Sequence, residues 1–202
     1  MAEAVYLDQD LPVAGLKRNS VGWWGILCLI ATEASLFAYL LFSYAYFAVR
    51  FGPRWLPQAH PALKLALPDT IILLASSGVI WWAEQGAKTG RRRQHLIGVA
   101  VTMAMGVVFL IVQAFEWSGK TFTITSGSYG SLYFIITGLH MAHVVVGLII
   151  LGVVFAWSAA GDFTPRRHTP VLISSTYWHF VDVVWLVVFT TIYLAPYVWA
   201  SS

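Results

Sequence analysis

A histidine and a carboxylate, His179 and Asp182, lie three residues apart within the apolar stretch 177–185. An ionisable side chain inside a membrane costs at least about 2.5 kcal/mol, so such residues are usually kept for a function. On a helix this spacing places both side chains on one face, where a neighbouring group or a chain of water molecules can hydrogen-bond to both. The pattern therefore predicts a polar contact within a membrane-spanning helix.

The composition is that of an integral membrane protein. Of the 202 residues, 58% are hydrophobic and 10% are charged, and the mean hydropathy is +0.71; a soluble domain of this length is far more polar. Residues 1–20 contain acids and Lys17-Arg18 but no apolar core, so we expect a tail rather than a cleavable signal peptide. The single cysteine, Cys28, excludes an internal disulfide.

Five apolar runs are long enough to cross a bilayer, because about 20 helical residues span a hydrocarbon core of about 30 Å. The sequence therefore predicts an all-α integral membrane protein, in which the tail 1–20 precedes a single transmembrane domain of five helices, 21–202. The second run is the least regular, since it contains Ser76-Ser77-Gly78 and has Pro68-Asp69 near its start. The predicted spans are 22–49, 65–83, 96–115, 131–157 and 172–199.

The basic residues are divided unequally between the two sides that five spans define. Eight of the 12 Lys and Arg residues lie on the side of the N-terminal tail, which predicts a cytoplasmic N-terminus and a C-terminus outside. Short basic loops beside a span favour contact with lipid head groups over nucleic-acid binding, and we expect the five loop arginines, Arg91 to Arg93 with Arg166 and Arg167, to make that contact. The eight are Lys17, Arg18, Lys88, Arg91, Arg92, Arg93, Arg166 and Arg167.

The interior of the spans carries few ionisable groups. We assign two of the nine acids to it, Glu33 and Asp182, together with His140, His143 and His179. All basic residues are assigned to loops or tails, so a buried carboxyl has no Lys or Arg partner, and we expect Glu33 to be largely protonated at neutral pH unless water reaches it. At 1.5 Å per residue Glu33, Asp182, His140 and His143 lie about 14–18 Å deep, so the spans can bring the ionisable groups together near the middle of the bilayer.

Two interpretations of the histidines remain open. His140 and His143, with His179 from another helix, can hydrogen-bond across helices, or can present imidazole nitrogens to one metal ion or haem. No CxxCH, HExxH, Ser-His-Asp, Walker or dinucleotide pattern is present. We therefore favour the hydrogen-bonding interpretation and predict no catalytic site in this chain.

Two functions of other classes are alternatives. A membrane cytochrome with bis-histidine ligation would show a Soret absorbance in the isolated chain. A stand-alone proton or solute carrier would use Glu33 and Asp182 and would be expected to contain an inverted repeat. The first and last spans share neither a motif nor a glycine pattern, so the sequence does not favour a carrier.

Several stretches resemble subunit III of the haem-copper terminal oxidases, the cytochrome c oxidase subunit III family. The most specific is 177–185 in the last span, and the resemblance extends from about Val21 to Tyr197. The family's buried glutamate, known for modification by a carbodiimide, matches Glu33, and this reactivity fits a protonated carboxyl. The other matching stretches are Thr32-Glu33 with Phe37, 73–77, 113–116, Tyr129-Gly130-Ser131, 137–140 and His143-Val144.

The resemblance implies an accessory subunit that carries no cofactor of its own. Haem and copper would lie in partner subunits, and this chain would flank subunit I, contact subunit II and bind phospholipid in a bacterial plasma membrane. The family role implied is to support proton uptake from the cytoplasmic side and to protect the oxidase from inactivation during turnover. Glu33, His140, His143, His179 and Asp182 would then be buried polar contacts that fix the register of the helices.

The sequence also departs from the longer members of the family. Those have seven spans, so this chain resembles a short form that lacks the first two. Met141 stands where a glycine commonly follows the first histidine of the fourth span, and the histidine-rich connection before the last span is reduced to 166–170. These differences leave open which complex the chain belongs to: a cytochrome c oxidase, a quinol oxidase or a relative associated with nitric-oxide reductase. They also leave open whether that complex joins a respiratory supercomplex.

Overall fold

The computed structural model describes residues 21–55, 63–160 and 169–196, and all its regular secondary structure within these ranges is helical. The five long helices are α1 (Val21–Phe51), α2 (Leu63–Lys88), α3 (Arg92–Ser118), α4 (Ser128–Ala160) and α5 (Thr169–Phe189). A 3-10 turn, Gly52–Trp55, follows α1, and a π-helical turn, Thr190–Leu194, extends α5. Each long helix is long and apolar enough to cross a membrane, which confirms the predicted fold class.

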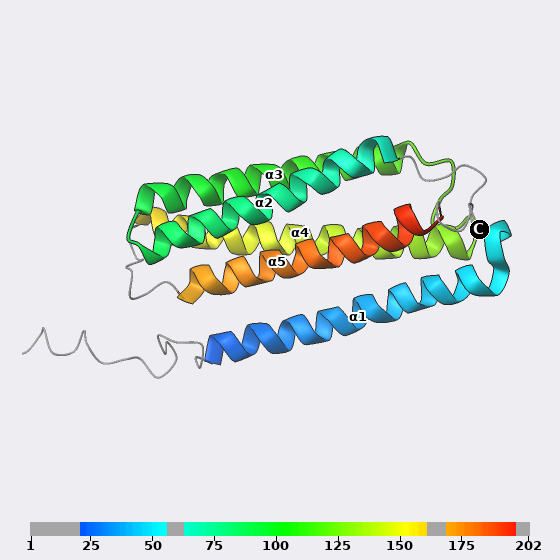
Figure 1. Ribbon diagram of the computed structural model, residues 1–202, viewed down its shortest axis with the longest axis horizontal. Coiled ribbons are helices and arrows are strands. Elements are labelled where there is room, and N and C mark those ends of the chain that lie inside the picture. The colour runs from blue at the N-terminus through cyan, green and yellow to red at the C-terminus, as the bar shows by residue number, and fades with distance from the viewer. Residues whose placement is uncertain (1–20, 56–62, 161–168, 197–202) are drawn as a thin grey trace, which may run out of the picture.

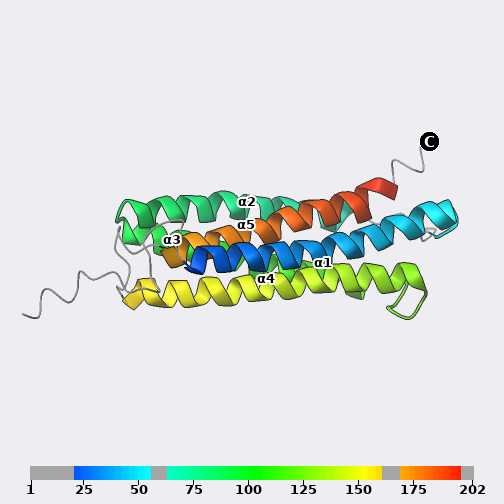
Figure 2. The ribbon, with the colours of Figure 1, turned by 90° about the horizontal axis from the view of Figure 1, so that it is seen from below.

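The helices run side by side along the long axis of the molecule (Figures 1 and 2). The helices α2 and α3 form an antiparallel pair joined by a short turn, and α5 packs against α1, α2 and α4. The helix α5 is the most buried of the five, and α1 is the least buried. Among the long helices, α1 makes extensive contact only with α4 and α5. The helix α5 is therefore the central helix of the described bundle.

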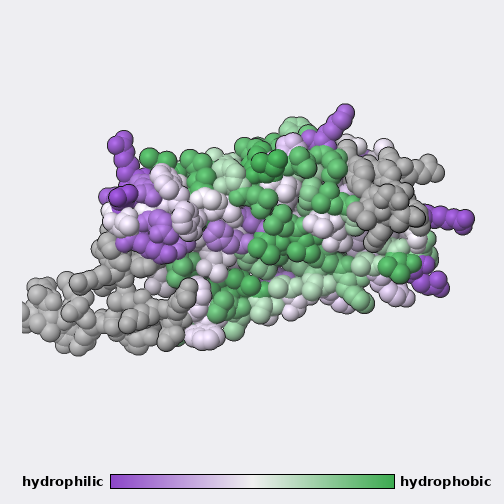
Figure 3. Space-filling model, viewed as in Figure 1, coloured by the Kyte–Doolittle hydropathy of each residue, from purple (hydrophilic) through white to green (hydrophobic). Residues whose placement is uncertain are grey.

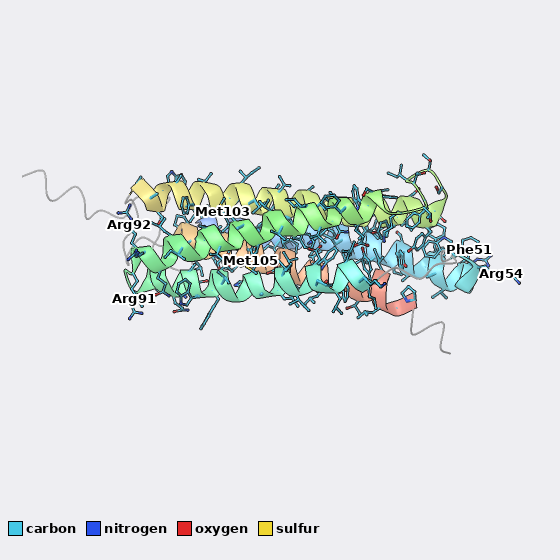
Figure 4. All side chains as sticks on the ribbon, turned by 90° about the horizontal axis from the view of Figure 1, so that it is seen from above. Phe51, Arg54, Arg91, Arg92, Met103 and Met105 are labelled. Carbon is cyan, nitrogen blue, oxygen red and sulfur yellow. The ribbon has the colours of Figure 1, made fainter. Side chains whose placement is uncertain are left out.

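The two ends of the bundle carry different loops. Arg91 and Arg92 lie at the end where α2 turns into α3, whereas Phe51 and Arg54 lie at the opposite end (Figure 4). Hydrophobic side chains cover much of the surface between the ends, and hydrophilic side chains project near them (Figure 3). This distribution suits a bundle that crosses a bilayer, while the direction in which it crosses stays a prediction from the charge count.

The helix α2 is continuous through both Pro68-Asp69 and Ser76-Ser77-Gly78, the two features that made the second apolar run irregular. Pro68 is the sixth residue of α2, so its missing N–H removes one backbone hydrogen bond close to the helix start. Ser76 turns its hydroxyl back to the carbonyl of Leu73, at 2.6 Å, and also accepts a hydrogen bond from Trp178 of α5. The serines of this segment are thus helix contacts and do not interrupt the helix.

Glycines of α3 and α4 make room for the indole of Trp178. This ring is fully buried, and a Cβ atom at Gly106 would lie 2.6 Å from its Cη2 atom, while one at Gly147 would lie 2.9 Å from its Cε3 atom. Both distances are too short for carbon atoms in contact. Trp178 therefore fixes the spacing of three helices at one level of the bundle.

We expect Gly106→Ala to destabilise the chain by about 1–3 kcal/mol, because the new methyl group overpacks a site bounded by a rigid ring. The measurement is the free energy of unfolding of the purified chain in detergent. Gly78→Ala is the matched control: Gly78 is also helical, and a Cβ atom there meets nothing within 4 Å. Equal stabilities of the two variants would show that the indole moves aside.

Candidate functional site

The helices α1 and α4 are joined by a contact between Glu33 and His143. Oε2 of Glu33 lies 3.0 Å from Nε2 of His143, and Nδ1 of His143 lies 2.7 Å from the carbonyl oxygen of Leu139. A carbonyl oxygen only accepts hydrogen bonds, so Nδ1 carries a hydrogen. Either Glu33 is protonated and donates to Nε2, or an imidazolium donates to a carboxylate. In both arrangements one proton lies between the two side chains and the pair is uncharged overall.

The helices α2 and α5 are joined at Ser77, which contacts both His179 and Asp182. The hydroxyl of Ser77 donates to Oδ2 of Asp182. Since a hydroxyl has a single hydrogen, it accepts the hydrogen bond from Nδ1 of His179, at 2.9 Å. Oδ1 of Asp182 has no partner among the described residues. One side chain on α2 thus contacts both residues that the sequence places on one face of α5.

His140 lies apart from both contacts. Its side chain is fully buried, and neither ring nitrogen has a hydrogen-bond partner among the described residues. The ring stacks on the indole of Trp185, with 4.8 Å between centroids, and meets the edge of Phe109 at 5.6 Å. The five predicted residues are therefore not gathered at one point: they form two separate interhelical contacts and one aromatic packing site.

The count of acids within the spans was wrong, because it left out Asp69 inside the second predicted span and because α2 and α3 extend beyond the apolar runs to include Glu84 and Glu116. Asp69, Glu84 and Glu116 are also helical and buried. Glu84 accepts from Ser175 of α5 at 2.7 Å and pairs with Lys88 at 2.5 Å. Acid and lysine stand four residues apart, a spacing that favours an ion pair on a helix and that repeats at positions 116 and 120. This repeated Glu-x-x-x-Lys spacing is the sequence signal from which the second and third predicted spans could have been lengthened to include Glu84 and Glu116.

Of the arginines predicted to contact lipid head groups, Arg92 has a partner within the protein. Its guanidinium donates to the carbonyl oxygens of Ser158, at 3.0 Å, and Ala159, at 2.5 Å, near the end of α4. Arg91 and Arg93 are exposed at the same end of the bundle. Contact with lipid remains a prediction for these two residues, and Arg166 and Arg167 lie outside the described residues.

These polar side chains form hydrogen bonds between helices. Within the described ranges no three His, Cys, Asp or Glu side chains are grouped as metal ligands would be. Both ring nitrogens of His143 already take part in hydrogen bonds, as does one of His179. Fold and contacts together define a multi-pass helical membrane protein whose buried polar groups connect its helices.

The comparison with known families identifies this membrane protein further. A family model for cytochrome c oxidase subunit III matches residues 15–201. The chain therefore belongs to the cytochrome c oxidase subunit III family, as the motifs of the last, fourth and first spans predicted.

Individual relatives show the same similarity. The chain is 35% identical to cytochrome c oxidase subunit 3 of Equus caballus over 177 residues, which cover 84% of this chain and 68% of that protein. It is 35% identical to the protein of the same name from Marchantia polymorpha over 179 residues, with 84% and 67% covered. The corresponding protein of Osphranter robustus is 36% identical over 179 residues, with 84% and 68% covered. The chain thus spans about two thirds of the length of these relatives.

Proposed function

We propose that this chain is the non-catalytic accessory subunit III of a respiratory haem-copper terminal oxidase of the cytochrome c oxidase type, in a bacterial plasma membrane. The observation that carries the proposal is the family match over 15–201. The ionisable groups of the chain support it, because the polar contacts described above join helices of the chain to one another. Haem and copper would then belong to the partner subunits.

The lightly packed first helix supports a role beside a partner. Away from α4 and α5, α1 presents large apolar and aromatic side chains to its surroundings, such as Tyr39, Phe42 and Val49. A helix of this kind suits lipid tails and the helices of another membrane subunit. We propose that subunit I is the main contact, with subunit II and phospholipid as further neighbours and the N-terminus in the cytoplasm.

The contact between Glu33 and His143 is our candidate for the role in proton uptake. The Glu33 side chain retains 28% of its accessible surface and the His143 side chain retains 12%. The pair that joins α1 to α4 is therefore partly accessible from outside the bundle. A pair that shares one proton becomes negatively charged when it passes that proton to a neighbouring group, and a second proton taken up from its surroundings restores the neutral pair. We propose that it supports proton entry into the adjacent subunit without taking part in the redox chemistry.

Purification of the tagged chain from its native membrane, followed by mass spectrometry of the proteins that accompany it, tests the proposal. We expect a partner that contains the haem-copper histidines. A copper-binding second subunit would indicate a cytochrome c oxidase, and a second subunit without copper would indicate the quinol branch. Recovery of the chain with no oxidase subunit, under conditions that preserve other respiratory complexes, would contradict the accessory role.

The role of Glu33 is tested by the variants Glu33→Ala and His143→Ala in the assembled oxidase. Because the pair lies outside the redox machinery, we expect initial rates within about twofold of wild type but a shorter active lifetime under sustained turnover. If the two residues act as a pair, the double variant should lose no more lifetime than either single variant. Complete loss of haem reduction in an assembled Glu33→Ala enzyme would contradict this role.

A further inference from the structure

A second group of buried polar side chains lies toward the end of the bundle that carries Phe51 and Arg54. Its members are Asp69 of α2 and Gln113 and Glu116 of α3. Asp69 and Gln113 are fully buried, and Glu116 is 6% exposed. Gln113 and Glu116 are three residues apart and share one face of α3. The carboxyl of Asp69 lies within electrostatic range of that of Glu116.

These three side chains carry buried polar atoms that form no regular hydrogen bond with a described residue. Both carboxyl oxygens of Asp69, both amide atoms of Gln113 and Oε2 of Glu116 make no hydrogen bond of regular geometry. The amide of Gln113 lies beside the hydroxyl of Tyr193, which itself donates to Oε1 of Glu116 at 2.8 Å. Buried polar atoms are normally paired with protein, water or an ion. Gln113 thus adds an unpaired neutral ligand to two acids.

The charges of this group do not balance within the described protein. Glu116 is neutralised by Lys120, whose Nζ lies 2.7 Å from Oε1, and it also accepts from Tyr133 at 3.2 Å. Asp69 makes no ion pair with any described residue, so its carboxylate, when ionised, is a negative charge that no described residue balances. The other described basic residues of this end are exposed at the surface: Arg50, Arg54 and Lys64.

We propose that Asp69, Gln113 and Glu116 bind one monovalent alkali cation of the sodium class. Carboxylate and amide oxygens are the ligands that hard cations prefer. One positive charge balances the group, whereas a divalent ion would leave it positive. Glu116 is two residues from the end of α3, and Asp69 is six residues from the start of α2. An ion can therefore enter from the aqueous phase at this end, and once bound it joins α2 to α3.

The test uses the full chain in its native complex, in sodium chloride and in choline chloride at equal ionic strength. Sodium at saturation should raise the thermal unfolding midpoint of this chain by about 5 °C, because a ligand that binds only the folded state stabilises it. Asp69→Asn should lose this response, since it removes the unbalanced charge and leaves a neutral side chain of the same shape. Glu84→Gln, a buried acid toward the other end of the bundle, is the matched control and should keep the response.

Equilibrium dialysis with radioactive sodium gives a second measurement. The wild-type complex should bind one more sodium ion than the Asp69→Asn complex, and Gln113→Leu should weaken that binding at least tenfold if Asp69→Asn does not accumulate. Equal midpoints in sodium and choline would overturn the proposal, as would a sodium response that persists in Asp69→Asn. A midpoint that depends on pH but not on sodium would also overturn it, because a proton would then supply the missing charge.

Discussion

Trp178→Ala is expected to lower the free energy of unfolding of the chain by about 3 kcal/mol. This is the low end of the range for buried aromatic residues in soluble proteins, because lipid rather than water surrounds the separated helices. The variant leaves a cavity facing Gly106 and Gly147, and it removes the hydrogen bond from the indole Nε1 to Oγ of Ser76, at 2.9 Å. The measurement is equilibrium unfolding of the purified chain in detergent.

Trp81→Ala is the control for this prediction. Trp81 belongs to α2 but is 57% exposed, so its truncation should change stability by less than about 0.5 kcal/mol. A similar loss in both variants would mean that tryptophan contributes through the membrane surface and not through packing at the centre of the bundle.

Asp182→Lys is expected to prevent accumulation of the folded chain in the membrane. The side chain is 2% exposed and its Oδ2 accepts from Ser77, so lysine would lose this hydrogen bond and place an unpaired ammonium among apolar residues. A central lysine costs about 3 kcal/mol even on the most lenient insertion scale. The measurement is the amount of monodisperse chain extracted from membranes by mild detergent.

Asp182→Leu should be tolerated better than Asp182→Lys. Leucine removes a carboxyl that has one unpartnered oxygen and keeps the hydrogen bond between Ser77 and His179. Replacing a buried polar group by an apolar one avoids the cost of an unpaired charge. Equal yields of the two variants would contradict burial of Asp182 and indicate that water reaches it.

The five long helices could be predicted from local sequence, as could the presence of Glu33, Asp182 and three histidines within them. Apolar runs of about 20 residues define the spans whatever their neighbours are, because backbone hydrogen bonds in lipid must be made within the helix. The family was also predictable, since the motif at 177–185 and the elements around Glu33 and His143 are specific in type and spacing.

The partners of these residues could not be predicted, because a partner is set by how helices pack and not by spacing along one helix. His140 and His143 differ by three positions, yet one stacks on Trp185 and the other reaches Glu33 on α1. Ser77 looked like part of an interruption of the second span, whereas it is the contact for His179 and Asp182.

The acids near helix ends were missed for a different reason. Hydropathy ends a span where the first charged residues appear, although a helix can continue when a lysine four residues away pairs with the acid, as in Glu84 with Lys88 and Glu116 with Lys120. Asp69 has no such pair and lies inside the second apolar run, where its neighbours gave no local sign of its burial.

The absorption spectrum of this chain after its separation from the purified oxidase tests the central claim most directly. An accessory subunit should show no Soret band, and the remaining subunits should keep all the haem and their initial rate of turnover. Haem that stays with the separated chain, and is lost when His140 or His179 is replaced by alanine, would contradict the accessory role and favour a membrane cytochrome.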